Sequence, residues 1–258
     1  REEWARVYGQ MHAKQKGERV PAPTEWHEPE ADLYPGLTAK PFHAAGDAWY
    51  AARTAEAVAH LERFYPVIKE ELLALRLGTL KQYRQPNSAI RQEREVSADG
   101  TSALLHEFGD WKVLHLQLEG KDTREQCKLA PRTAKVVRST PRSAGHALFS
   151  VLEPGTHILP HCGPSNTKLR LHLGLIIPDG DCSVRVGDQK RPWTEGKVLV
   201  LDDAFQHEVW NNTEAQRVVL IVDIWHPDFS DKEVGYIVET RQARRRHEKW
   251  EEERAQAR

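Results

Sequence analysis

The sequence is poor in cysteine and lacks long apolar runs. Its 258 residues include three cysteines, none in a CxxC pair, which excludes a disulfide-rich scaffold and a cysteine-based zinc site but leaves one disulfide open. No stretch approaches the roughly 20 apolar residues of a membrane span, so we expect no membrane anchor in this segment. Because the first residue is Arg rather than Met, we expect a piece of a longer or processed protein.

The sequence also has no excess of positively or negatively charged residues. Lysine and arginine total 37 and aspartate and glutamate total 38, which gives a formal net charge of −1. Such a balance produces no overall field that would draw the protein to nucleic acid or an anionic membrane, so we expect no nucleic-acid partner. Hydrophobic residues make up 39% and charged residues 29% of the chain, which predicts a folded core under a very polar surface.

The first third of the chain predicts helices and a connecting segment. Residues 1–20 are charged and favour a helix, whereas residues 21–46 are rich in proline and form a surface connection. A helical pattern begins at Asp47, a suitable N-cap residue. Pro66 is expected to divide this pattern into two helices or to begin a new one. Its apolar residues recur at spacings of three and four: Leu61, Phe64, Ile68, Leu72 and Leu75.

From Trp111 onward the hydrophobic period changes from helical to two, which is typical of strands. Short strands separated by turn residues predict a β-sandwich or barrel, and residues 238–258 predict a solvated helix. The predicted strands are residues 111–118, 147–152, 168–175, 197–201 and 217–225.

The strand at residues 168–175 alternates strictly, with four leucines on one face and Lys168, Arg170 and His172 on the other. A second cation, Arg217, opens a nearly apolar strand. A guanidinium inside a sandwich is costly unless it meets an anion. Either each arginine pairs with a nearby aspartate, such as Asp202, Asp203 or Asp223, or it binds an anionic ligand; alternation alone leaves both open.

Two histidines lie beside these strands. His161 is expected in a loop between strands, and His207 follows a strand and an Asp202-Asp203 turn. Neutral imidazole is a good ligand for iron, zinc or copper, although any one of 13 histidines is more often structural. Together with Ser150 and the two strand arginines, the pair suits a small diacid held by a metal at one end and by arginine at the other. 2-Oxoglutarate is such a diacid.

Five stretches resemble the catalytic core of the aspartyl/asparaginyl β-hydroxylases. They span the region from about residue 33 to 228: LYPGLTAKPF (33–42), FSVLEPGTH (149–157), PHCGPSNTKLRLHLGL (160–175), EGKVLVLDDAFQHEVW (195–210) and IWHP (224–227). The resemblance implies a mainly β fold with flanking helices, in which the core is a double-stranded β-helix of the jelly-roll or cupin-like type. It also implies three parts: an N-terminal helical or linker segment (1–32), the dioxygenase domain (33–228) and a C-terminal helical tail (229–258).

The resemblance further assigns roles by position. His161 and His207 correspond to the iron(II) ligands, Arg170 and His172 to partners of the C1 carboxylate of 2-oxoglutarate, and Ser150 and Arg217 to holders of its C5 carboxylate. The residue two after His161 is Gly163, so the usual two-histidine-one-carboxylate triad lacks its carboxylate, a trait of this family in which water takes the vacant position. Asp203 is expected to orient that water.

The implied enzyme uses iron(II), 2-oxoglutarate and O2 to hydroxylate Cβ of Asp or Asn in a peptide or protein, of the epidermal-growth-factor-like-domain type. Three alternatives are a lipid acyl-chain hydroxylase of the same family, a non-catalytic cupin-like binding module and a zinc hydrolase, for which two histidines make a poor site. The compartment stays open: the endoplasmic reticulum lumen for a full-length eukaryotic homologue, and otherwise the cytoplasm.

Overall fold

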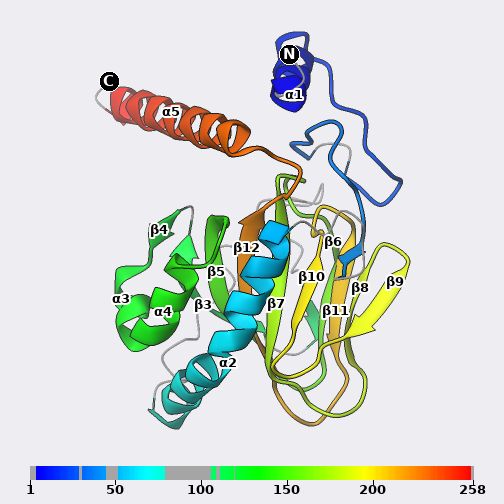
Figure 1. Cartoon of the computed structure of the whole chain (residues 1–258), viewed down its shortest axis with the longest axis vertical. Helices are drawn as coiled ribbons and strands as arrows, with labels where there is room; N and C mark the ends of the chain where they lie inside the picture. The colour runs from blue at the N-terminus through cyan, green and yellow to red at the C-terminus, as the bar shows by residue number, and fades with distance from the viewer. Residues whose placement is uncertain are drawn as a thin grey trace.

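The computed structural model describes residues 4–28, 31–44, 52–78, 106–108, 111–118 and 120–256. Two antiparallel sheets pack face to face, with helices outside them (Figure 1). The seven-stranded sheet has the order β1 (Phe42–His43), β10 (Val198–Leu201), β7 (Lys168–Ile176), β12 (Arg217–Trp225), β5 (Ser143–Leu152), β3 (Trp111–Leu118) and β4 (Lys121–Asp122). The five-stranded sheet has the order β2 (His106–Phe108), β6 (Thr156–His161), β11 (His207–Asn211), β8 (Cys182–Val186) and β9 (Gln189–Pro192).

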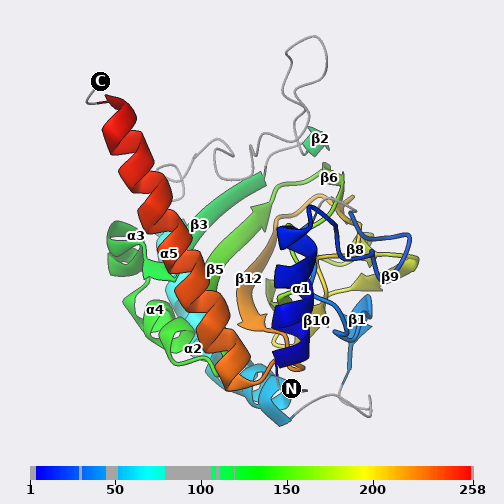
Figure 2. The ribbon, with the colours of Figure 1, turned by 90° about the horizontal axis from the view of Figure 1, so that it is seen from above.

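The five helices of the described residues are α1 (Ala5–Gln15), α2 (Ala52–Gly78), α3 (Arg124–Leu129), α4 (Pro131–Arg138) and α5 (Asp231–Gln256). α2 and α4 cover the outer face of the large sheet, whereas α1 and α5 lie at one end of the sandwich (Figures 1 and 2). None of these helices is both long and apolar enough to cross a bilayer.

Three apolar clusters follow from the alternation of the strands. The leucines of β7 pack outward with Leu61, Ile68 and Leu72 of α2. A second cluster fills the space between the sheets, with Trp111, Leu148 and Trp193 among its members. The third joins α1 and α5 to the end of β12. Because successive strand residues point to opposite faces, packing the leucines outward turns the polar face of β7 toward the space between the sheets.

Most sequence expectations are confirmed, namely the jelly-roll fold class, the predicted strands and the terminal helices. The expectation for Pro66 is wrong, since α2 runs unbroken through it; proline removes one backbone hydrogen bond, and packing of the apolar face on the sheet holds the helix together. Asp47 lies outside the described residues. The three cysteines form no disulfide.

Candidate functional site

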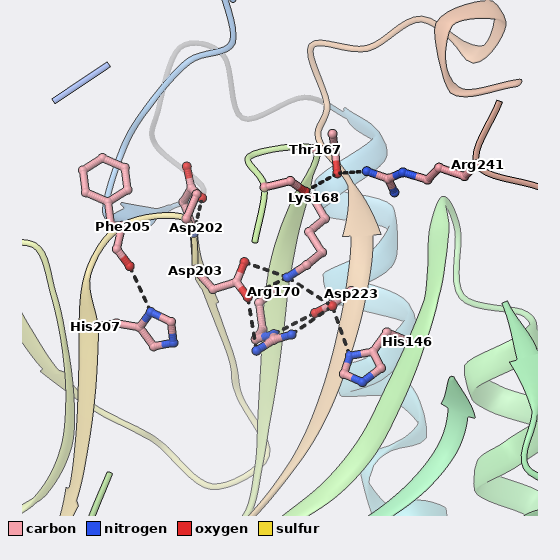
Figure 3. A network of polar contacts seen from close by, with 12 residues as sticks. His146, Thr167, Lys168, Arg170, Asp202, Asp203, Phe205, His207, Asp223 and Arg241 are labelled. Atoms are coloured by element: carbon pink, nitrogen blue, oxygen red, sulfur yellow. Dashed lines mark hydrogen bonds and ion pairs between the residues drawn. The ribbon is translucent and has the colours of Figure 1, made fainter. Parts of the chain in front are cut away.

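The two candidate metal ligands meet across a strand pair. His161 is the last residue of β6 rather than part of a loop, which corrects the sequence expectation, and it lies opposite His207, the first residue of β11. Their ring centroids are 4.1 Å apart. Nδ1 of His161 lies 2.8 Å from the carbonyl oxygen of Leu159. Nδ1 of His207 lies 2.9 Å from the carbonyl oxygen of Phe205 (Figure 3). Each Nδ1–H therefore donates to the backbone, which leaves Nε2 with its lone pair.

The electrostatics of this pair suit metal ligation. Burial lowers the pKa of His207 to about 3, with a smaller contribution from His161. Burial also lowers the pKa of His161. Both imidazoles are therefore neutral at physiological pH, the form that binds a divalent metal without first losing a proton. Backbone carbonyls that fix the tautomer of both rings are a common feature of metal-binding histidines.

The missing third ligand has a steric cause. A Cβ atom at Gly163 would lie 2.8 Å from the backbone oxygen of Asp203 and 2.9 Å from its Oδ2. The Gly163 N–H donates to that same backbone oxygen at 2.6 Å. Asp203 thus occupies the space that a side chain at position 163 would need. Within the described residues, no group of three His, Cys, Asp or Glu side chains is placed to hold a metal ion, so the rest of a coordination sphere would come from water or a ligand.

Arg217 is a buried cation that pairs with no carboxylate of the described residues. Its side chain is 2% exposed, and its NH1 donates to the carbonyl oxygen and to Oγ of Ser150, at 3.2 Å each. Its Cζ lies 4.7 Å from the centre of the Trp193 ring, and its Nε has no acceptor. Burial lowers the pKa of Arg217 to about 10, so the group stays charged at neutral pH at a cost to stability. Ser150 Oγ also accepts from Trp111 Nε1 at 3.0 Å, so the serine proton remains available to a further acceptor.

His172 presents a second buried donor. Its Nδ1 accepts a hydrogen bond from Trp193 Nε1 at 3.2 Å, so in the neutral ring the proton is on Nε2, which has no partner. Burial holds the pKa of His172 well below its usual value, and the charges of Arg170 and Arg217 lower it further. Buried donors without acceptors are rare in folded proteins. The unpartnered donors of His172 and Arg217 fit an anionic molecule with more than one acceptor.

Arg170 differs from Arg217 because it already has carboxylate partners. Its Nε and NH2 donate to Asp223 at 2.8 and 3.0 Å, and its NH1 lies 3.2 Å from Asp203 Oδ2. Lys168 Nζ contacts the same two carboxylates, and His146 Nδ1 lies 3.2 Å from Asp223 Oδ2 (Figure 3). The sequence left two possibilities open for each arginine: pairing with a nearby aspartate or binding an anionic ligand. In the structure Arg170 pairs with aspartates, whereas Arg217 does not.

These charges stabilise one another in a buried network. Burial alone would raise the pKa of Asp203 and Asp223, but Arg170 and Lys168 outweigh it and lower both. The same two carboxylates raise the pKa of Arg170 against the opposing effect of burial. Asp203 accepts from Lys168 and contacts Arg170, so its position is fixed by cations as well as by the backbone at Gly163.

The histidine pair and the charged network share one pocket of about 450 Å³. Its other walls come from β3, β5 and β12, and include Trp111, Leu148 and Ile221. Ser150, His172, Arg217 and Trp193 are buried and do not line the pocket, and they are joined to one another by the contacts described above. Of the residues predicted for the site, four line this pocket, namely His161, His207, Arg170 and Asp203. The other three, Ser150, His172 and Arg217, form a buried group with Trp193.

Several residues of the site were given no role from the sequence. Trp193 contacts His172 and Arg217, the two residues that carry unpartnered donors, and His146 and Lys168 bind the carboxylates of the network. Asp223 was considered only as a local partner for an arginine. The available signal was the carboxylate of Asp223 inside a strand that is otherwise apolar after Arg217, since such a residue marks a buried ion.

A family model and two curated relatives with the same description match this chain. Residues 62–227 match the family model described as aspartyl/asparaginyl beta-hydroxylase. The human aspartyl/asparaginyl beta-hydroxylase is 35% identical over 202 residues, which are 77% of this chain and 24% of that protein. The ornithine lipid ester-linked acyl 2-hydroxylase of Rhizobium tropici is 37% identical over 173 residues, 66% of this chain and 57% of that protein.

The chain spans about a quarter of the length of the human and mouse relatives that it matches. Among solved structures, an oxidoreductase of the 2OG-Fe(II) oxygenase family from Burkholderia pseudomallei covers 48% of this chain and 72% of its own, with a TM-score of 0.34 and 16% identity.

Proposed function

The chain belongs to the aspartyl/asparaginyl beta-hydroxylase family, and from this premise we propose that it is an iron(II)- and 2-oxoglutarate-dependent dioxygenase that hydroxylates Cβ of Asp or Asn in a peptide. The observation that carries the proposal is the pairing of two neutral histidines, His161 and His207, with a buried arginine that has no anion, Arg217, at one site.

The residues fit the proposed metal and cosubstrate. Bound iron(II) and 2-oxoglutarate would supply the oxidative chemistry, in which O2 is consumed, succinate and CO2 are formed and one oxygen atom is inserted into a C–H bond. His161 and His207 would hold the metal through Nε2, since each Nδ1 is engaged by a backbone carbonyl.

The chain's own donors would hold the diacid at its two ends. Arg217 and the Ser150 hydroxyl would bind the C5 carboxylate, which would satisfy the unpartnered Arg217 Nε and neutralise its charge. His172 Nε2–H would donate to the C1 carboxylate. Arg170 would keep Asp223 and Asp203 as partners and act on that end through its remaining N–H groups. Asp203, fixed against Gly163, would accept from water in the position that lacks a protein carboxylate.

The acceptor is proposed to be Asp or Asn in a small domain of the epidermal-growth-factor-like type. The direct test offers the purified protein iron(II), ascorbate, 2-oxoglutarate and a cyclic peptide that contains Asp, and measures peptide mass and succinate. We expect the peptide to gain one oxygen atom with the wild type and with His247→Ala, a control on the exposed surface of α5, and no gain with His207→Ala. Iron bound tightly without succinate would instead identify a non-catalytic binding module.

A second candidate is hydroxylation of a lipid acyl chain. The match to the acyl 2-hydroxylase of Rhizobium tropici favours it, because it covers more than half of that protein. Leu148, Ile221 and Trp111 give the pocket apolar walls that an acyl chain could contact. Oxygen gain by an acyl lipid dispersed in detergent, without oxygen gain by the peptide, would select this candidate.

A further inference from the structure

Helix α5 contributes a cation to the pocket from outside the residues that match the family. Arg241 lines the 450 Å³ pocket together with Lys168 and Thr167. Its NH2 donates to Thr167 Oγ1 at 3.2 Å (Figure 3), and its Cζ lies 5.5 Å from the centre of the Trp225 ring. The family match ends at residue 227, so this contact belongs to the chain's own C-terminal helix.

The charges of the pocket are paired except at Arg241. Lys168 and Arg170 face Asp203 and Asp223, as described above. The remaining acidic residue of the lining, Asp32, has its own partner in Lys14 at 2.9 Å.

Arg241 contacts one hydroxyl group and one aromatic face, and no carboxylate of the described residues lies within ion-pair distance of it. A cation without a counter-ion is therefore left on the pocket wall.

The position of Arg241 also suits a substrate longer than the pocket. A second cavity, of about 280 Å³, lies between α1 and α5 and is lined by Arg241 and Asp32 as well. Arg241 therefore stands where the two cavities meet. Arg244 lines the second cavity too, whereas Lys14 of the same lining is paired with Asp32.

We propose that Arg241 forms an outer subsite for a carboxylate of the substrate, so that the enzyme selects peptides in which acidic residues flank the acceptor. This inference rests on the proposed function and specifies its substrate class. A guanidinium is planar and stacks on aromatic rings. Trp225 and Thr167 therefore hold Arg241 in one orientation, and its other N–H groups remain able to bind a carboxylate through two parallel hydrogen bonds.

The test compares two peptides that carry the same Asp acceptor, flanked by Glu in one and by Gln in the other. Binding is measured by calorimetry at low salt with the purified chain, without iron or 2-oxoglutarate. We expect the wild type to prefer the Glu peptide. Arg241→Met keeps the aliphatic stem on Trp225 but removes the charge, and should weaken binding of the Glu peptide by about tenfold while leaving binding of the Gln peptide unchanged.

Two further variants separate charge from structure. Arg241→Lys should retain part of the preference, since it keeps the charge but not the paired hydrogen bonds. Arg246→Ala, an exposed arginine on the same helix, should behave as the wild type. An equal affinity of the wild type for both peptides, no binding of either, or an undiminished preference in Arg241→Met would overturn the subsite.

The same peptides distinguish this inference from the proposed function. Preference for the Glu peptide that depends on Arg241, without succinate or oxygen gain when iron and 2-oxoglutarate are added, would support the subsite and refute the dioxygenase. Oxygen gain with the same kcat/KM for both peptides would support the dioxygenase and refute the subsite.

Discussion

Arg217 and Arg170, two arginines of adjacent strands, should respond in opposite ways to the same substitution. Burial lowers the pKa of Arg217 from 12.5 to about 10, a difference of about 2.5 units. At about 1.4 kcal/mol for each unit of pKa, the charged guanidinium costs the fold roughly 3–4 kcal/mol. The pKa is lower in the folded state, so this cost is complete at any pH below about 10 and is relieved only between pH 10 and 12.5.

Methionine at position 217 would remove that cost along with two hydrogen bonds to Ser150, each contributing about 1 kcal/mol, and the contact with Trp193. We therefore expect Arg217→Met to be within about 1 kcal/mol of the wild type, or more stable. Arg170→Met would leave Asp203 and Asp223 buried with Lys168 as their shared cation, and breaking a buried ion pair in this way costs about 3–5 kcal/mol.

Urea unfolding at pH 7.5, followed by tryptophan fluorescence, measures both changes in the ligand-free protein. Ligand binding is tested by measuring Tm under anaerobic conditions with iron(II), in the presence and absence of 2-oxoglutarate. A ligand at 100 times its Kd stabilises the folded state by about 2.7 kcal/mol. Relative to iron(II) alone, 2-oxoglutarate should therefore raise the Tm of the wild type by several degrees and leave the Tm of Arg217→Met unchanged. A loss of stability in Arg217→Met as large as that in Arg170→Met, or a retained response to 2-oxoglutarate, would refute the assignment of Arg217 as an anion-binding residue.

Three further substitutions test two residues beside the site and one helix contact on the outer face of the large sheet. Burial raises the pKa of Asp202 to about 8, against an ordinary value of 3.8, so stability should fall as pH rises from about 4 to 8. Asp202→Asn, which keeps the oxygen that accepts a backbone N–H, should remove this slope and be more stable at pH 7.5 by a few kcal/mol; equal slopes in urea unfolding would contradict this. Gly163→Asp should not complete a metal triad, because its Cβ would overlap Asp203; we expect a loss of about 1–3 kcal/mol, and tighter iron binding at unchanged Tm would argue against it. Glu71 accepts two backbone N–H groups at the start of α4, so Glu71→Ala should cost about 2 kcal/mol, whereas the neighbouring exposed Glu70→Ala should cost under about 1 kcal/mol; thermal unfolding of the two variants compares them.

The sequence by itself determined where the strands lie and which face of the strand at residues 168–175 is polar. Strand alternation is a local property, because successive side chains point to opposite faces. The run from Lys168 to Leu175 therefore already separated a packing face from a polar face, and the structure confirms both. A prediction from local sequence failed at Pro66, where a helix break was expected. Packing of α2 against the sheet outweighs the one backbone hydrogen bond that proline removes, so the helix continues.

The tertiary structure alone decided which groups have partners. In the register of β12 against β7, Asp223 lies opposite Arg170, whereas Arg217 lies opposite the apolar Leu152 of β5. The same pairing principle brings His161 and His207 together across β6 and β11, although 46 residues separate them. Strand register and the pairing of distant strands are set by how whole sheets pack, which is why the sequence predicted two buried cations but could not tell that one is neutralised and the other is not.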